Sequence, residues 1–326
     1  MEDKWSAILR RFPEANFLQS LKYGRMNELL GCRVIVADFD GKGWSLMIVR
    51  DAKRGRYLEV PCGPLIDWGD AETVKACFKR IGEIGEREKC VFVRVRPQLL
   101  ATEENLELLQ KLGLKKSPMH LAAEHTVIID LTLSEEELLT GMRRQTRYEV
   151  RRAQKLGITV VNGRSEADYK EFQMVQAQTA KRQGFVPPSL ETLLALRRAF
   201  GRNATIYKAI TAEGEAIAYG LVVCEGAEGD YYEAASTDLN RKLPGAYALL
   251  WQAMKDLKTA GYTRFNLWGI APAGQPGHRY AGVTTFKTGF SDNVTEFVPA
   301  HDLVLSRVKY LKDYVVETAR KKRRHL

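Results

Sequence analysis

The sequence predicts a mixed α/β fold arranged in two halves of similar element order. Segments with strand-like and helix-like patterns alternate along the chain, and its 326 residues are comfortable for two domains. No low-complexity tract and no linker rich in Pro or Gly interrupts this alternation. The halves cover roughly residues 1–140 and 141–300, and their sequences do not visibly repeat each other.

The first half contains three strand-like runs and two helix-like segments. The strands are expected at residues 33–39, 44–51 and 91–97, and the helices at 70–89 and 103–112. Asp40, Gly41 and Gly43 lie between the first two strands and predict a hairpin turn. In the longer helix the apolar residues recur with helical spacing, which predicts a single apolar face.

The second half opens with a strand over 125–133, followed by Ser134 and, three residues on, Glu137. This spacing is typical of a capping box, and the helix that it opens is expected to run to Gly157. Later strand-like segments are expected at 158–163, 204–226 (a hairpin), 229–237 and 263–269, and later helices at 166–182, 190–200 and 246–260.

The composition is that of a globular protein with a basic surplus. Apolar residues make up 45% and charged residues 28% of the chain, and 50 Lys and Arg against 40 Asp and Glu give a net charge of +10. This surplus suggests an anionic partner such as RNA, a phosphate-bearing lipid or a phosphorylated small molecule. A merely basic soluble protein is the alternative.

Cysteine and histidine usage argues against metal sites and disulfides. The five cysteines and five histidines lack metal-ligand spacing, so neither a zinc site nor a disulfide framework is expected. No run approaches the roughly 18 apolar residues of a membrane span, and the N-terminus lacks the apolar stretch of a signal peptide. We therefore expect a cytoplasmic protein.

A cluster of cations lies in the helix expected to end at Gly157. Arg143, Arg147 and Arg151 are spaced four apart and fall on one helical face. Like charges at this spacing repel by a few tenths of a kcal/mol per pair, so we expect this face of the helix to bind anions. The alternative is a solvated surface helix.

Residues 241–247 lie between a strand and a helix. In acetyl-CoA-dependent acetyltransferases this junction carries a Gly-rich loop whose backbone N–H groups bind pyrophosphate. Here Pro244 has no N–H to donate, which weakens a CoA-binding interpretation.

Residues 268–299 combine Gly and Pro with aromatic residues, a mixture often found in binding loops. Within them, Lys287 lies between Phe286 and Phe290. In a partly dry pocket its charge would stabilise a developing oxyanion far better than in water. The alternative is a surface lysine beside core aromatics.

Five consecutive cations occupy residues 320–324 near the C-terminus. Such a run usually forms a flexible solvated end, and it also attracts RNA or an anionic membrane surface.

No Ser-His-Asp or Cys-His arrangement for a protein nucleophile is suggested.

Six segments spread over most of the chain match the motifs of one family in the same order. They are residues 17–31 (FLQSLKYGRMNELLG), 60–67 (VPCGPLID), 146–158 (TRYEVRRAQKLGI), 180–185 (AKRQGF), 231–270 and 281–290 (AGVTTFKTGF). With them the chain resembles the Fem family of peptidoglycan bridge-forming transferases (FemA, FemB and FemX), with Tyr23 where Trp is usual.

The resemblance implies two tandem domains similar to acetyltransferases of the GNAT fold. Domain 1 would comprise residues 1–140 plus 303–326, because the final helix returns to it, and domain 2 would comprise residues 141–302. FemA-like members insert a helical coiled-coil arm. No sustained heptad pattern occurs here, so the chain resembles the compact FemX type.

The resemblance also implies the roles of several residues. Lys287 would stabilise the oxyanion, with Phe286 beside it as part of the same motif, and Tyr231 or Tyr232 would contact substrate. The phosphates of the acceptor would be bound by Arg182, with Arg147 as a weaker candidate. The remaining substrate-binding candidates are Arg151, Tyr23 and Lys22. Where the family has a phosphate-binding Lys soon after its opening motif, this chain has Asn27.

The implied activity is tRNA-dependent aminoacyl transfer from aminoacyl-tRNA to the stem-peptide amine of lipid II or UDP-MurNAc-pentapeptide. The ester is already activated, so the enzyme need only align the partners, assist amine deprotonation and stabilise the oxyanion. Aminoacyl-tRNA would be a co-substrate, with no cofactor and no metal. The protein would be a monomer, with peripheral contact at the inner face of the membrane left open. The alternatives are an acyl-CoA-dependent N-acyltransferase of the same fold and a non-catalytic RNA-binding protein.

Overall fold

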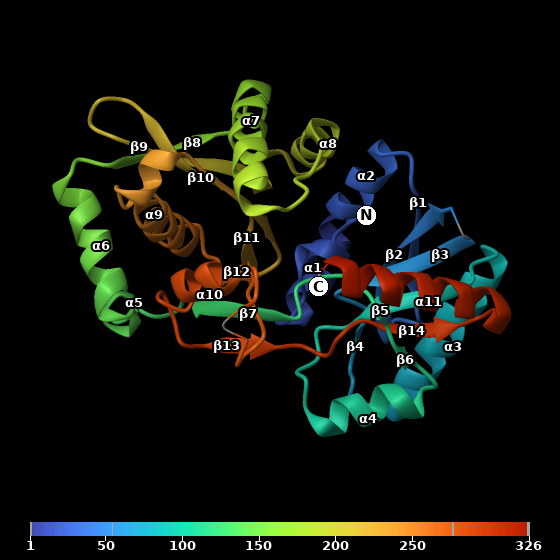
Figure 1. The fold of residues 1–326 in the computed structure, drawn as a ribbon. Helices are drawn as coiled ribbons and strands as arrows, with labels where there is room; N and C mark the ends of the chain where they lie inside the picture. Colours follow the sequence, from blue (N-terminus) through green and yellow to red (C-terminus); the bar gives the residue numbers. More distant parts are fainter. Residues whose placement is uncertain (1, 54, 276, 325–326) are drawn as a thin grey trace. The chain divides into compact units, whose positions relative to one another are not determined.

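A seven-stranded sheet forms the centre of each of two units in the computed structural model, which describes residues 2–53, 55–275 and 277–324 (Figure 1). The first unit comprises Met1–Glu124 and Glu296–Leu326, and the second comprises His125–Thr295. Among the described residues, no helix combines the length and the apolar character needed to cross a membrane.

These boundaries correct the expected domain limits at residues 140 and 303. Strand β7 (His125–Asp130) pairs with β12 (Arg264–Gly269) and therefore belongs to the second sheet. Strand β14 (His301–Val304) pairs with β5 (Phe92–Arg96) of the first sheet. The chain passes from the first unit to the second, and later back again, at earlier residues than expected. Backbone pairing decides which sheet a strand joins, and the sequence pattern does not specify that pairing.

The first unit has its strands in the order β1-β2-β3-β5-β14-β6, with β4 paired to β2. All of these neighbours are antiparallel except β3 and β5, which are parallel. Its remaining elements are α1 (Glu2–Arg11), α2 (Leu21–Leu29), β1 (Arg33–Asp38), β2 (Gly43–Ala52), β3 (Gly55–Pro61), β4 (Leu65–Ile66), α3 (Ala71–Arg87), α4 (Glu103–Lys111), β6 (Lys115–Lys116) and α11 (Arg307–Arg324).

Opposite faces of this first sheet bury different helices. On one face, Met47 and Leu58 of the central strands pack with the predicted apolar face of α3. On the other face, Leu46 and Ile48 pack against α1. Farther along that second face, Tyr310 of α11 lies edge-on to Phe92, with ring centroids 5.5 Å apart. Helix α11 is therefore fixed to the sheet by one of its sides.

The second unit has its strands in the order β13-β7-β12-β11-β10-β9-β8. Strands β11 and β12 are parallel, and β11 pairs antiparallel with β10. Its remaining elements are α5 (Glu135–Gly141), α6 (Arg144–Lys155), β8 (Thr159–Gly163), α7 (Glu166–Gln183), α8 (Leu190–Phe200), β9 (Ala204–Ile210), β10 (Ala216–Glu225), β11 (Glu228–Ser236), α9 (Gly245–Thr259), α10 (Ala281–Lys287) and β13 (Val294–Glu296).

Helices also cover both faces of the second sheet. Helices α6 and α9 share one core cluster with it, in which Val150 and Leu250 are buried. On the opposite face, Lys208 of β9 pairs with Asp168 and Glu171 of α7 at 2.8 and 2.7 Å. The expected α/β fold with two sheet-centred units is confirmed, and no long coiled-coil arm occurs among the described elements.

The helix expected over residues 134–157 begins as predicted but is divided in two. Ser134 and Glu137 form the predicted capping box. Helix α5 then ends at Gly141, because the Arg143 amide donates to the Gly289 carbonyl at 2.8 Å instead of continuing the helix. Helix α6 starts afresh at Arg144. A tertiary hydrogen bond, absent from any local pattern, makes this break.

Two segments expected to lack regular structure are helical. Residues 281–287, expected within a loop, form α10, and Lys287 is its last residue. The cations at 320–324, expected as a flexible end, continue α11. Residues 325–326 of the expected tail lie outside the described residues.

Candidate functional site

A β-bulge in β11 brings three consecutive residues to one cavity. Glu233 is opposite Leu221 in β10 and Tyr231 is opposite Val222, so Tyr232 is the extra residue of the bulge. In a regular strand, neighbouring side chains point to opposite faces. The bulge breaks this alternation, and all three side chains line the cavity.

Strands β11 and β12 separate where this cavity lies. Their parallel pairing covers Glu228–Asp230 and Arg264–Asn266 and extends no farther. Strand β12 also carries an irregularity against β7, within which Trp268 has a left-handed backbone with φ of 62°. The diverging strand ends leave an open space that helix α10 and its neighbours border.

The β11–β12 cavity has a volume of about 650 Å³ and lies within the second unit. Its walls combine aromatic rings with a small number of polar groups, as is usual for small-molecule sites. The lining residues are Thr179, Gln183, Phe185, Tyr231, Tyr232, Glu233, Ala234, Ala235, Ser236, Asn240, Ala246, Tyr247, Trp268, Gly269, Arg279, Tyr280, Gly282, Val283, Phe286 and Lys287.

Lys287 is buried in the cavity wall, with only 8% of its surface exposed. Its ammonium donates to the Gly269 carbonyl at 2.9 Å and lies 6.0 Å from the centre of the Tyr231 ring. No carboxylate of the described chain lies within ion-pair distance of it. Burial therefore lowers the pKa of Lys287 to about 7, although the charge of Glu233 opposes this shift.

Glu233 is the acidic group of the same cavity. The side-chain amide of Gln176, on α7, donates to its carboxylate at 2.6 Å. Burial raises the pKa of Glu233 to about 7, with the hydrogen bond from Gln176 and the charge of Lys287 acting in the opposite direction. The side-chain oxygen of Gln176 is itself buried and accepts no hydrogen bond from the described residues.

The two ionisable groups therefore change protonation state near neutral pH. Each is shifted toward its neutral form by burial and back toward its charged form by the other. A proton can consequently leave Lys287 or reach Glu233 at small free-energy cost at neutral pH. This arrangement suits chemistry in which one proton is taken up and another is released.

Aromatic rings shape the rest of the cavity. Tyr247 contacts Phe286 edge-on, with ring centroids 5.0 Å apart, and Tyr232 contacts Trp268 in the same way at 5.5 Å. Tyr231 packs over Gly220, where an added Cβ would lie 2.4 Å from its ring. Glycine is therefore needed at this position to seat the Tyr231 ring.

The structure brings four of the predicted site residues together at this cavity, namely Lys287, Phe286, Tyr231 and Tyr232. Arg182 lies just behind its wall. The Arg182 guanidinium donates to the Ser236 carbonyl and to the Thr179 hydroxyl, and both of these residues line the cavity.

The other predicted residues lie elsewhere. The Arg147 guanidinium donates to the carbonyls of Thr140 and Met142, so it caps the C-terminal end of α5. Arg151 is exposed on α6. Tyr23 and Lys22 are part of α2 in the first unit, and burial together with the charge of Glu59 raises the pKa of Tyr23 to about 12.

Sequence reasoning missed three groups of the cavity. Glu233 was concealed within a strand-like run, although an acid beside two tyrosines is a signal that could have been followed. Gln176 comes from α7, 57 residues earlier, and no local pattern links the two. Trp268 belonged to the aromatic segment but had no role assigned, because its backbone irregularity is visible only in the fold.

One family model matches most of this chain, and solved structures share its fold. The FemAB family model matches residues 9–212 and 195–318. The solved structure of FemX aligns with a TM-score of 0.85 and 17% identity, covering 97% of this chain and 98% of that chain. L-PGS from Bacillus licheniformis aligns with a TM-score of 0.60 and 16% identity, covering 95% of each chain.

At such identities the two structural likenesses establish a shared fold. A comparison with curated protein sequences finds no significant match. The family model, by contrast, accounts for most of the sequence through its two matched ranges, and this protein belongs to the FemAB family.

Proposed function

We propose that the protein transfers an amino acid from aminoacyl-tRNA to the stem-peptide amine of a peptidoglycan precursor, either lipid II or UDP-MurNAc-pentapeptide. Membership of the FemAB family assigns it to the transferases of peptidoglycan biosynthesis. The observation that carries the finer proposal is the buried Lys287 in the same aromatic cavity as Glu233. These groups supply a cation and a base, which are what aminolysis of an activated ester requires.

The proposed reaction begins with Glu233 as a carboxylate and Lys287 as an ammonium. The acceptor nitrogen adds to the ester carbonyl carbon, and Glu233 accepts the proton that this nitrogen loses. Lys287 stabilises the oxyanion of the tetrahedral intermediate. The bond between the carbonyl carbon and the ribose oxygen then breaks, and Lys287 donates a proton to that oxygen. Return of the proton from Glu233 to Lys287 restores the starting state.

The remaining site residues are assigned to binding. Phe286, Tyr231 and Tyr232 would hold the aminoacyl and acceptor groups against Lys287, since their rings line the cavity. Arg182 would bind phosphate of the precursor near the cavity wall. Arg151, Tyr23 and Lys22 remain candidates for more distant substrate contacts, whereas Arg147 is committed to the end of α5.

Acyl-CoA is the less suitable donor. Pro244, just before α9, has no N–H. The Gly245 amide donates to the Leu243 carbonyl at 2.9 Å, and the Ala246 amide donates to the Asn240 side chain at 3.0 Å. Three donors of a pyrophosphate-binding turn are therefore missing or occupied. We propose aminoacyl-tRNA as co-substrate, no further cofactor, and a monomer acting at the cytoplasmic side of the membrane.

The test is transfer of a labelled amino acid from charged tRNA to a soluble lipid II analogue, with and without RNase. Transfer that RNase abolishes supports the proposal. RNase-resistant transfer from acyl-CoA would instead establish the acyl-CoA-dependent alternative. Tight RNA binding without any transfer would establish a non-catalytic RNA-binding protein.

A further inference from the structure

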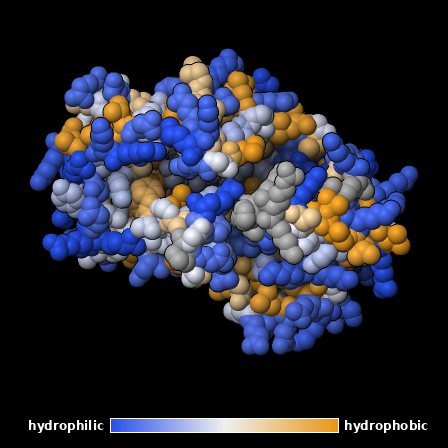
Figure 2. All heavy atoms as spheres, viewed as in Figure 1, coloured by the Kyte–Doolittle hydropathy of each residue, from blue (hydrophilic) through white to orange (hydrophobic). Residues whose placement is uncertain are grey.

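Helix α11 exposes an apolar stripe on the side that faces away from its sheet. Val308, Leu311 and Val315 are 75%, 64% and 59% exposed, respectively. Their spacing of three and four residues places them on one face of the helix. Figure 2 shows hydrophobic surface over α11 bordered by hydrophilic atoms. Single exposed apolar residues are ordinary, but an aligned stripe marks a contact surface.

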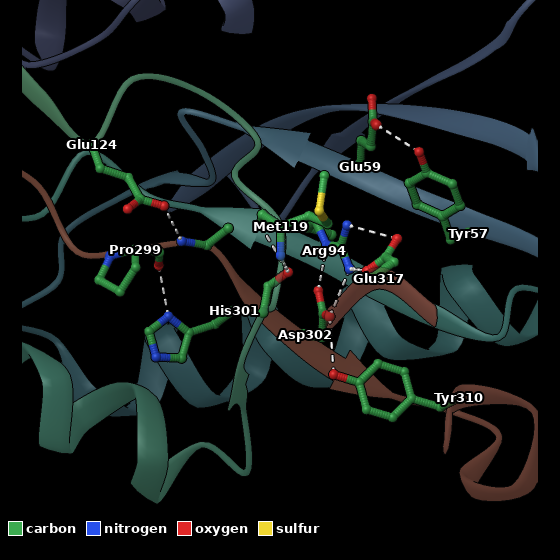
Figure 3. Close-up of polar contacts among 12 residues, drawn as sticks. Tyr57, Glu59, Arg94, Met119, Glu124, Pro299, His301, Asp302, Tyr310 and Glu317 are labelled. Atoms are coloured by element: carbon green, nitrogen blue, oxygen red, sulfur yellow. Dashed lines mark hydrogen bonds and ion pairs between the residues drawn. The ribbon is translucent and has the colours of Figure 1, made fainter. Parts of the chain in front are cut away.

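The opposite side of α11 is held firmly to strands β5 and β14 of its own unit (Figure 3). Tyr310 is buried, and its hydroxyl donates to Asp302 at 3.0 Å. Glu317 accepts a hydrogen bond of 2.7 Å from Arg94, which also makes a two-bond contact with Asp302 at 2.8 and 2.9 Å. Because this side is anchored, rotation of the helix cannot bury the apolar stripe.

Charge is distributed unequally between the two sides of the helix. Residues 307–324 contain eight Lys and Arg and two acids. The acids, Asp313 and Glu317, are on the anchored side, where Asp313 is buried and Glu317 is paired with Arg94. Beside the stripe, Lys309 and Lys312 are exposed. The outward surface of α11 is therefore both apolar and cationic.

We propose that α11 is an interfacial helix that docks the protein on the surface of a bilayer containing anionic lipids. The apolar stripe enters the boundary between headgroups and acyl chains, and the flanking lysines contact anionic headgroups, a combination that characterises helices lying in the interface. RNA would use the same cations but has no use for exposed valine and leucine, because its affinity comes largely from phosphate contacts. The stripe therefore favours a lipid surface over RNA.

The inference does not rest on the proposed reaction, because none of its residues lines the β11–β12 cavity. It concerns where the protein acts. A surface helix of this kind would hold the enzyme at a membrane without any spanning segment.

The test is flotation of the full-length protein with vesicles of equal parts phosphatidylglycerol and phosphatidylcholine, compared with pure phosphatidylcholine. Wild type should bind the anionic vesicles and not the neutral ones. Lys309→Gln/Lys312→Gln should lower the partition coefficient roughly 10- to 30-fold, since each cation near such a surface contributes about 1 kcal/mol. Leu311→Gln/Val315→Gln should lower it by about tenfold or more.

The matched control is Val36→Gln/Val294→Gln, which alters two exposed valines that are not part of α11 and should leave vesicle binding unchanged. A tRNA filter assay separates lipid from RNA, because Leu311→Gln/Val315→Gln should bind tRNA like wild type. Melting temperatures establish that each variant is folded. The proposal is overturned if wild type fails to bind anionic vesicles, if the Leu311/Val315 variant binds them normally, or if that variant loses tRNA binding instead.

Discussion

The side-chain amide of Gln176 donates to the carboxylate of Glu233 at 2.6 Å, and this contact orients an acid in the wall of the cavity that also holds Lys287. Gln176 belongs to α7 and Glu233 to the bulged strand β11. The contact fixes the orientation of the Glu233 carboxylate, as a proton acceptor in the proposed reaction would require. Substitutions of Glu233, Lys287 and other residues test the roles proposed for them.

Lys287→Met should slow the chemical step by roughly two to three orders of magnitude, which is the usual loss for one oxyanion donor. Acceptor binding should change little, because the loss concerns charge that develops in the transition state. Single-turnover transfer from charged tRNA at saturating acceptor measures this step. Lys181→Met, at an exposed lysine of α7, is the control. If the Lys287→Met variant retained more than about a third of the wild-type rate, Lys287 would be removed from the mechanism.

Lys287→Met should also stabilise the fold, and most strongly at low pH. The folded-state pKa of Lys287 is about 7, below its ordinary value of 10.5. Burial of Lys287 therefore costs no stability above pH 10.5, where its amine is neutral in the folded and the unfolded state. The cost grows as pH falls to about 7, because the unfolded chain binds a proton that the folded protein would have to bury. The gain in melting temperature on replacing it with Met should be larger at about pH 6 than at about pH 9. Thermal unfolding at both pH values gives the comparison, and an equal or reversed difference would contradict the burial argument.

Glu233→Gln should lower the transfer rate at neutral pH by roughly 100-fold or more, since positioned bases contribute about that much. In wild type the rate should rise with pH as Glu233 ionises, near its pKa of about 7, and fall again as Lys287 loses its proton, also at a pKa of about 7. The Gln variant should lack this rise, while the hydrogen bond with Gln176 is retained by its amide oxygen. The pH profile of single-turnover transfer is the measurement. Glu213→Gln, in an exposed turn, should behave like wild type, and a Glu233 variant with the wild-type profile would exclude it as the base.

Arg147 and Arg151 should behave differently although they share one helical pattern. Arg147→Ala should lower the free energy of unfolding by about 1–3 kcal/mol, because two carbonyls at the end of α5 lose their donor. Arg151→Ala should leave stability unchanged and weaken tRNA binding, with the deficit shrinking at high salt. Denaturant unfolding and salt-dependent filter binding separate the two effects. Equal behaviour of the two variants in both assays would refute this division.

Asp302→Ala should be strongly destabilising, by about 3–5 kcal/mol, because it leaves the buried Arg94 with less compensation. It also removes the acceptor for Tyr310 and so loosens α11. Asp51→Ala, which breaks the exposed ion pair with Arg56, should cost under about 1 kcal/mol. Thermal unfolding of the two variants tests the contrast. Comparable losses would mean that the buried network of Figure 3 is not an anchor.

Local pattern alone determined much of this protein. The helix with Val74 and Phe78 on one face, the capping box of Ser134 and Glu137 and the mixed α/β class follow from residue spacing and short-range hydrogen bonds. Aromatic residues that flank a lysine also predict a binding region around Lys287.

Tertiary structure decided the rest, because it depends on pairing between residues far apart in the chain. The bulge at Tyr232 arises from the register between β10 and β11, and it turns Glu233 into the cavity. The break before Arg143 needs the Gly289 carbonyl. The lowered pKa of Lys287 requires the walls that bury it. The sequence indicated candidate residues, and the fold determined how far they are buried, which groups they contact and where their side chains point.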